Sequence, residues 1–295
     1  MLSIAKRKMI VAALALGAAT LSTSGNKAWA APSTSLSDNN STLSYSTVTD
    51  AISWTVDGVN EFGGTPAGGD LLQYFNGSAF VPLSNLNVVS SSLTGNVGTA
   101  TLSGTLDGDN FTVALQVILS GGNAGSGASG ISEQITVNNL GPAADADAVK
   151  SAAVAGNPVD FMISDTFDAN LNATPTNDTL TLSPSGAPNK AVQTDPTGVK
   201  LTYSTTPTPS QFAIINNGSS SSATGPQTGN EAFNFVWNLS LAPDDTGIIS
   251  NAISLSGQGS STVVGVPLPN AAWSALATLA GLGVLGIVRR KRAKA

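Results

Sequence analysis

The sequence FNFVWNLSL occupies residues 233–241, and this stretch decides the fold of the chain. Apolar side chains stand at every second position, and Asn or Ser fills most of the positions between them. The apolar positions are Phe233, Phe235, Trp237, Leu239 and Leu241. Because side chains alternate between the two faces of a β-strand, this pattern predicts a strand with one face buried in a core.

Shorter alternating runs recur along residues 45–265 and predict further strands. Polar turns separate them: residues 107–110 read DGDN, which favours a hairpin turn, and residues 121–130 and 216–230 are loops rich in Gly and Ser. Many antiparallel strands joined by polar loops predict an all-β body, an antiparallel β-sandwich with jelly-roll-like connections. The apolar positions of the shorter runs are Ile52, Trp54, Val56, Ala100, Leu102, Leu106, Phe111, Val113, Leu115, Val117, Leu119, Ile131, Ile135, Val137, Val159, Phe161, Ile163, Val199, Leu201 and Tyr203.

Two segments lack this alternation. Residues 31–44 are rich in Ser, Thr and Asn, and we expect a solvated lead-in before the sandwich. Residues 142–155 are rich in Ala, which favours one short helix.

The N-terminal segment has the three parts of a secretory signal peptide. Basic residues 6–8 precede an apolar run at residues 9–19, and Ala28 and Ala30 form the small-residue pattern of a signal peptidase site. We therefore expect residues 1–30 to be removed by signal peptidase, with cleavage after Ala30.

The C-terminal segment, residues 266–295, also has three parts. Val266, Pro267, Leu268 and Pro269 precede an uncharged apolar run over residues 270–288, and a basic tail follows at residues 289–294. A helix over the apolar run would be roughly 28 Å long, close to the thickness of a bilayer core. The basic cluster should hold that end of a transmembrane helix in the cytoplasm. It comprises Arg289, Arg290, Lys291 and Arg292.

This three-part order resembles the PEP-CTERM sorting signal of Gram-negative bacteria, in its VPLPA-type variant. The resemblance implies an exported precursor anchored in the inner membrane by its C-terminal helix. An exosortase-like membrane protease would cut near Pro267–Pro269 and deliver the body to the cell surface or the medium. Leu268 replaces the Glu of the common signal, and Asn270 replaces the usual Ala of the variant. A permanent membrane anchor is the alternative.

The stretch from Leu268 to Ala272 also resembles the sortase signal Leu-Pro-Xaa-Thr-Gly. Ala271 and Ala272 stand in place of the Thr and Gly at which sortase cuts, so exosortase is the better match. Residues 50–250 more loosely resemble a domain of other PEP-CTERM proteins, at residues 54–59, 130–137 and 233–243.

Composition excludes several functions. All 18 acidic residues of the chain lie in residues 31–265, against three lysines and no arginine, which gives this body a formal net charge of −15. Such a surface repels nucleic acid and anionic membranes. The chain has no His and no Cys, which excludes Ser-His-Asp catalysis, His-ligated zinc and thiol chemistry.

Oxygen-rich clusters are the candidate cation sites. Asp165, Asp168 and Asn170 form the first choice for a weak Ca²⁺ site, because Ca²⁺ prefers carboxylate and carbonyl oxygens. Ordinary loop polarity is the better explanation of this cluster, and the weaker candidates are Asp107 with Asp109, Asp145 with Asp147, and Asp244 with Asp245. Glu133 interrupts an apolar strand face, either as a buried functional carboxylate or at a bulge.

These observations predict a non-enzymatic protein of the cell surface or extracellular matrix, associated with exopolysaccharide or biofilm and needing no cofactor. One alternative is a secreted carbohydrate-binding β-sandwich module, in which Tyr74 or Trp54 would stack on sugar rings, although core packing is the ordinary role of Trp54. Another is a glycan-active enzyme with two carboxylates facing each other about 5–10 Å apart.

Overall fold

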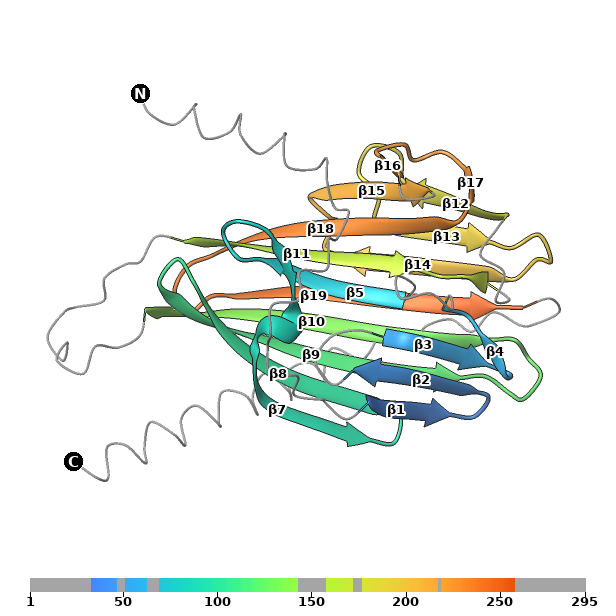
Figure 1. Ribbon diagram of the computed structural model, residues 1–295, viewed down its shortest axis with the longest axis horizontal. Coiled ribbons are helices and arrows are strands. Elements are labelled where there is room, and N and C mark those ends of the chain that lie inside the picture. Colours follow the sequence, from blue (N-terminus) through green and yellow to red (C-terminus); the bar gives the residue numbers. More distant parts are fainter. Residues whose placement is uncertain are drawn as a thin grey trace, which may run out of the picture.

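The computed structural model describes residues 33–46, 51–62, 69–142, 158–171, 177–216 and 219–257 (Figure 1). The predicted signal peptide, sorting motif, transmembrane helix and basic tail lie outside these residues. So do the core of the predicted Ala-rich helix and the acids Asp145 and Asp147. Among the described residues, no helix is long and apolar enough to cross a membrane.

The described body is built of antiparallel β-sheets, as predicted. The largest sheet has nine strands in the order β17-β12-β13-β14-β19-β10-β9-β8-β7. The consecutive strands β7 to β10 and β12 to β14 form two meanders on either side of β19, an order different from the jelly-roll-like connections predicted. The bounds are β7 Asn87–Thr94, β8 Val97–Leu106, β9 Asp109–Gly121, β10 Ser129–Pro142, β12 Asp178–Ser183, β13 Lys190–Thr194, β14 Lys200–Thr206, β17 Gln227–Gly229 and β19 Thr246–Ser256.

Two smaller sheets lie over one face of the nine-stranded sheet, and together they form a β-sandwich (Figure 1). One has six strands in the order β16-β15-β18-β11-β5-β6, with bounds β5 Gly69–Phe75, β6 Phe80–Pro82, β11 Val159–Asp168, β15 Gln211–Asn216, β16 Ser219–Ser221 and β18 Glu231–Leu241. The other has four strands in chain order, with bounds β1 Ser33–Asp38, β2 Ser41–Ser46, β3 Ala51–Val56 and β4 Val59–Asn60. A 3-10 turn, η2 Leu83–Asn85, follows β6.

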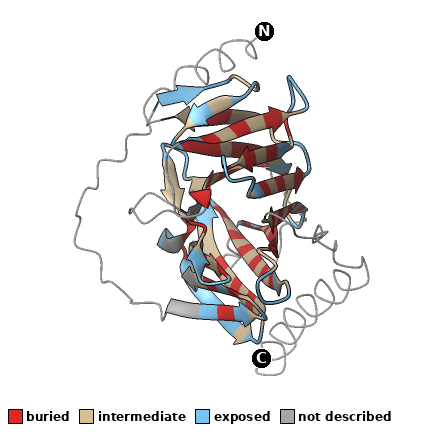
Figure 2. Ribbon diagram, turned by 90° about the vertical axis from the view of Figure 1, so that its right-hand side faces the viewer, coloured by how far each residue is buried: buried red, intermediate tan, exposed pale blue. Residues whose placement is uncertain are grey.

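The apolar faces of the strands meet between the sheets. Phe233, Phe235 and Trp237 of β18 are at most 1% exposed. This confirms the prediction that residues 233–241 form a strand with one face buried in the core. Their rings pack in a chain, with centroids 5.2 Å apart for the two Phe residues and 6.2 Å apart for Phe235 and Trp237. Figure 2 shows the result as alternating buried and intermediate bands along the strands.

The first sheet contradicts one expectation. Residues 31–44, predicted to be a solvated lead-in, contain β1 and most of β2. Leu36 and Leu43 are paired directly across these strands and are fully buried. Two isolated leucines among Ser and Thr are too sparse to reveal a strand, yet they suffice to anchor a hairpin on a neighbouring sheet.

Two carboxylates tie this small sheet to the large one: Asp38 of β1 accepts a hydrogen bond from the Gly121 N–H of β9 at 2.9 Å, and Asp57 makes the larger set of bonds. Asp57, in the turn after β3, accepts hydrogen bonds from the backbone N–H groups of Gly125 and Gly127 at 2.6 and 2.7 Å and from the Asn40 side chain at 2.9 Å. The hydrogen bond from Gly125 is the main reason that the pKa of Asp57 lies below its ordinary value. The turn of the first sheet and the β9–β10 loop are therefore held together by charge-assisted bonds.

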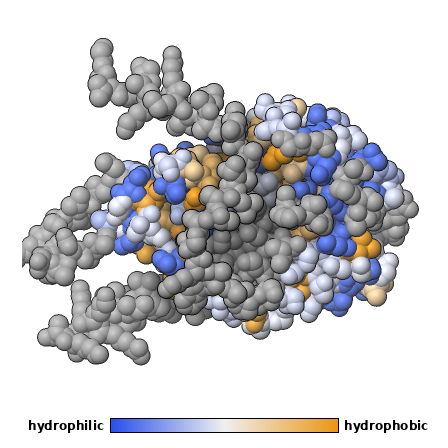
Figure 3. Space-filling view, in the orientation of Figure 1, coloured by the Kyte–Doolittle hydropathy of each residue, from blue (hydrophilic) through white to orange (hydrophobic). Residues whose placement is uncertain are grey.

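Turns and edges complete the architecture. Asp107 and Gly108 both have positive φ, 53° and 93°, and join β8 to β9 as the predicted hairpin turn. At one edge of the nine-stranded sheet lies β7, where Val88 and Val89 are 51% and 61% exposed and a register shift separates Val88 from Ser90. The described surface visible in Figure 3 is otherwise mostly hydrophilic, with small separate hydrophobic patches.

Candidate functional site

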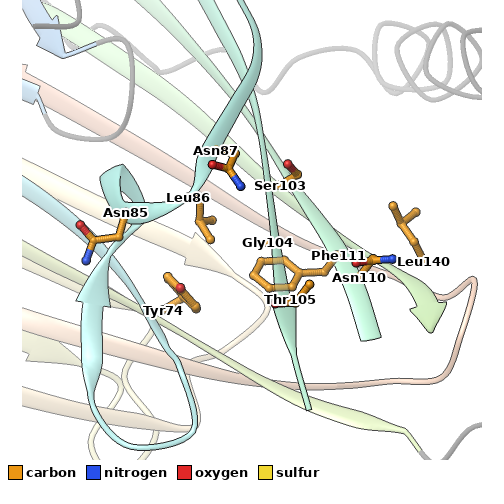
Figure 4. A pocket seen from close by; sticks show the side chains of 10 residues that line it. All are labelled: Tyr74, Asn85, Leu86, Asn87, Ser103, Gly104, Thr105, Asn110, Phe111 and Leu140. Atoms are coloured by element: carbon orange, nitrogen blue, oxygen red, sulfur yellow. The ribbon is translucent and has the colours of Figure 1, made fainter. Parts of the chain in front are cut away.

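A groove of about 540 Å³ opens beside the strand β7 edge of the sandwich. Tyr74 of β5 and Phe111 of β9 reach it from the two facing sheets, with ring centroids 5.8 Å apart. The other lining residues are Asn85, Leu86, Asn87, Ser103, Gly104, Thr105, Asn110 and Leu140 (Figure 4). Its volume lies in the range of roughly 300–1,000 Å³ that is typical of small-molecule sites.

The groove is polar but contains no charged side chain. Three amides, two hydroxyls and one phenol line it, and their side chains make no hydrogen bond to another residue within the described part of the chain. These groups are Asn85, Asn87, Asn110, Ser103, Thr105 and Tyr74. Each amide offers both a donor and an acceptor, and each hydroxyl can do either. The groove therefore presents uncommitted hydrogen-bonding groups around an aromatic floor.

Gly104 makes this geometry possible. A Cβ atom at this position would lie 2.6 Å from Cδ2 of Leu86 and 2.8 Å from Cζ of Phe111. Real Cβ atoms do not approach other carbons so closely, so any other residue here would push Phe111 and Leu86 away from the strand. Glycine thus sets the position of the aromatic floor.

Tyr74 is the titratable group of the groove. Burial raises the pKa of its phenol above the ordinary value of 10.0. The phenol therefore stays protonated at neutral pH and can donate a hydrogen bond to a bound oxygen. Tyr74, one of the two aromatic residues predicted to stack on sugar rings, lines the groove. Trp54, the other, is fully buried and donates a hydrogen bond to Ser129.

The proposed Ca²⁺ ligands do not converge. Asp165 belongs to the inward face of β11 with Ile163 and Phe167, and it is fully buried. Asp168 has the opposite parity on the same strand, so its side chain lies on the other face. Asn170 is buried beyond the strand end, where its backbone N–H bonds to the Glu61 carbonyl. No group of three or more acidic residues that could hold a metal exists within the described residues.

Asp165 instead takes part in a polar cluster between the sheets. It accepts hydrogen bonds from the Tyr203 hydroxyl and, at 3.4 Å, from the Asn251 amide. Asn251 also donates to Glu133 at 2.9 Å and accepts from Thr205 at 2.7 Å. All five side chains are at most 3% exposed. They link both sheets through the middle of the core, where solvent cannot reach them.

Glu133 is therefore a buried carboxylate and does not mark a bulge. Its register is continuous on both sides, opposite Val117 and Asn251. The irregularity of β10 falls later, between Asn139 and Gly141. Asp109 lies near that irregularity and accepts a hydrogen bond from Asn139 at 3.2 Å, so it serves the hairpin and no cation site.

A second buried acidic group was not predicted from the sequence. Thr179 pairs with Thr194, so continuing the register by one residue places Asp178 opposite Asp195, and both are at most 4% exposed. Burial is the main reason that the pKa of Asp178 rises from 3.8 to about 6, and the Asp195 carboxyl raises it further. Hydrogen bonds from Gln193, at 2.8 Å, and from the Leu171 N–H oppose this rise.

Two more acids at this end of the sandwich have raised pKa values. Burial raises the pKa of Asp168 to about 6 and also raises that of Glu231. Glu231 is 1% exposed, and neither of its carboxylate oxygens has a hydrogen-bond partner within the described residues. Alternation in β18 and β12 would have revealed both Glu231 and Asp178 as inward-facing, because each occupies the apolar phase of its strand.

No protein-family model matches the chain, and no curated protein matches it. The fold is similar to that of the galactose mutarotase related enzyme from Lactobacillus acidophilus, with a TM-score of 0.50 at 8% identity, covering 78% of this chain and 99% of that one. A galactose mutarotase-like protein from Lactobacillus casei has a TM-score of 0.45 at 12% identity, covering 75% and 99%. A bacterial glucoamylase in complex with acarbose has a TM-score of 0.47 at 7% identity, covering 75% of this chain but 31% of that one.

The similarity to the Lactobacillus acidophilus enzyme contradicts the prediction of a non-enzymatic surface protein sorted by an exosortase, because an enzyme has a sandwich of similar fold. The lack of His and Cys does not by itself exclude an enzyme. Their absence removes histidine and thiol mechanisms, but it leaves carboxylic acids and phenols, which are sufficient for much sugar chemistry.

Proposed function

We propose that this chain is a carbohydrate-active β-sandwich protein that holds a neutral saccharide in the groove beside Tyr74 and Phe111. One observation carries the proposal: six polar side chains without a hydrogen-bond partner among the described residues converge, with the partly exposed ring of Tyr74, on a groove without charge. Phe111 lies beneath Tyr74 and is 1% exposed, so it supports the Tyr74 ring and offers no surface of its own. Sugars present the same mixture, because their hydroxyl groups donate and accept hydrogen bonds while their C–H faces pack against aromatic rings.

The electrostatics favour an uncharged sugar over a uronic acid or a phosphorylated sugar. The acidic residues give the body a formal net charge of −15 from 18 acids and three lysines, and no lysine lines the groove. An anionic ligand would enter against this field without a cationic partner. The sugar-directed name of the enzyme with the similar fold agrees with this choice of ligand class.

The proposal is tested by isothermal titration of the full chain with glucose, galactose, lactose, maltose and glucuronate. We expect binding of at least one neutral sugar and none of glucuronate. Asn110→Ala should weaken binding about fivefold, because it removes one hydrogen-bonding side chain from the groove. Tyr74→Phe should weaken it similarly while keeping the ring. Asn123→Ala, an exposed amide in the β9–β10 loop, is the matched control.

Reaction is followed separately. The anomeric protons of each sugar, recorded by NMR with and without protein, report anomer exchange and bond cleavage. Absence of binding across the neutral panel, or binding that Asn110→Ala and Tyr74→Phe leave unchanged, would contradict the assignment of the groove.

A further inference from the structure

The outer face of the nine-stranded sheet is uncharged over most of its area. Along five adjacent strands of this sheet, β14, β19, β10, β9 and β8, the residues that alternate with the buried ones are nearly all Ser, Thr, Asn, Gln or small apolar residues. The face carries no carboxylate on these strands, although the chain has 18 acidic residues. Lys200, at its rim, is the single charged residue among them.

Register aligns these polar side chains into rows across the strands. Ser103, Thr112, Asn138 and Thr246 stand in one row. Asn138 donates to Thr112 at 3.2 Å and accepts from Thr246 at 2.8 Å. A parallel row begins at Thr99 and continues through the cross-strand pairs of β8, β9, β10 and β19, namely Gln116, Gln134 and Ser250, of which Gln134 is only 7% exposed. Neighbouring strands are about 4.8 Å apart, so each row is a regular series of hydroxyls and amides.

The groove joins this face. Ser103, Thr105 and Asn110 line the groove, and they have the outward parity of β8 and β9. Strand β7 pairs with β8 from Val97 to Ser103, where Asn87 is the first paired residue of β7. The last residues of β8, after Ser103, therefore have no β7 residue beside them. The polar side of the groove is therefore the first part of the outer face. Ile248, near the start of β19, is 48% exposed, so this end of the face is open to solvent.

We infer that the outer face of the nine-stranded sheet binds an extended neutral polysaccharide. One end of the polysaccharide chain enters the groove. The inference rests on the proposed function of the groove and extends it from a sugar to a glycan chain. The absence of carboxylates in an acidic chain is the main reason for this choice. A neutral glycan forms hydrogen bonds with rows of hydroxyls and amides, and a polyanion would meet only two cations on this face, Lys200 and Lys190 of the adjacent strand β13.

The chain-length dependence of binding tests the inference. The full chain is titrated with linear glucose and galactose oligosaccharides of increasing length, and it is run by native affinity electrophoresis in gels containing galactomannan, hydroxyethyl cellulose, amylopectin or polyuronate. We expect affinity to rise with oligosaccharide length and migration to slow in at least one neutral gel. Polyuronate should leave migration unchanged.

Variants separate the outer face from the groove. Gln116→Glu places a carboxylate of nearly the same shape in the middle of the face, and it should weaken binding of long chains about tenfold while leaving short sugars unaffected. Thr136→Ala removes one hydroxyl from the neighbouring row and provides a second, uncharged variant. Asn110→Ala should weaken short and long ligands alike.

Each outcome decides between the two proposals. If short sugars bind but affinity does not rise with length, the inference about the outer face fails and the groove proposal stands. If long chains bind independently of Asn110, the groove proposal fails instead. If light scattering reveals a dimer that Gln116→Glu dissociates, a second copy covers this face and the polysaccharide inference is overturned.

Discussion

Replacing Asp178 by Asn should stabilise the protein at neutral pH. Asp178 faces Asp195 across β12 and β13, and both carboxylates are buried. The side-chain Oδ2 of Asp178 accepts bonds from Gln193 and from the Leu171 N–H, and an Asn carbonyl oxygen can keep both. The Asn amide would then point toward Asp195 and replace a repulsion with a hydrogen bond.

The magnitude follows from the pKa of Asp178, which burial raises from 3.8 to about 6. This rise in pKa corresponds to a loss of at most ~3 kcal/mol of folding stability at neutral pH. Relaxation of the site reduces the expected gain of the Asn variant to about 1–3 kcal/mol. Because the folded state holds the proton more tightly than the unfolded state, this carboxyl destabilises the fold as pH rises from about 4 to about 6. Above that window the cost is constant, and below it the cost disappears.

Urea denaturation followed by tryptophan fluorescence measures the effect at pH 4, 5, 6 and 7.5. The free energy of unfolding of Asp178→Asn should exceed that of the wild type by about 1–3 kcal/mol at pH 7.5. This difference in unfolding free energy should shrink toward pH 4. Asp160→Asn, at an exposed position of β11, is the control for loss of one negative charge. A difference that does not depend on pH, or an Asp178→Asn variant less stable than wild type at pH 7.5, would refute the reasoning.

Three further substitutions test other contacts. Gly104→Val should abolish saccharide binding in titration and lower stability by about 1–3 kcal/mol, because its side chain would displace Phe111. Asp57→Ala should lower the free energy of unfolding by about 1–2 kcal/mol and so lower the thermal midpoint. Amide hydrogens of the β9–β10 loop should also exchange faster, and unchanged exchange would mean that other contacts hold the loop. Tyr203→Phe should cost about 1–3 kcal/mol in urea denaturation by removing a donor to buried Asp165, whereas a neutral result would show that the donor is dispensable.

Alternation was sufficient to predict the fold class and several strands. The run from Phe233 to Leu241 and the run that includes Phe111 both form long strands with one buried face. The partners of these strands were not predictable, because many runs have similar apolar faces and nothing local specifies which of them meet. Strand β14 pairs with β19, although their paired residues are more than 40 positions apart in the chain. This pairing depends on packing alone.

The candidate site was less accessible to sequence reasoning. Tyr74 could be named from its residue type, but Asn85 and Asn110 are ordinary polar residues until the fold brings them to one groove. Asp165 and Asp168 looked like neighbours in the sequence, and the parity of a β-strand separates them. Two residues that are close in the sequence of a strand therefore share a site only when their side chains lie on the same face of that strand.

The strand β7 has a consequence for handling and storage. It is an edge strand of eight residues with no charged side chain, and its two exposed valines would favour pairing with a strand from another molecule. The register shift beside Val89 interrupts the straight row of backbone groups that such pairing requires. Fibre formation on prolonged incubation should therefore depend on this irregularity, and shortening β7 by one residue at Val89 would turn a protected edge into a polymerising one.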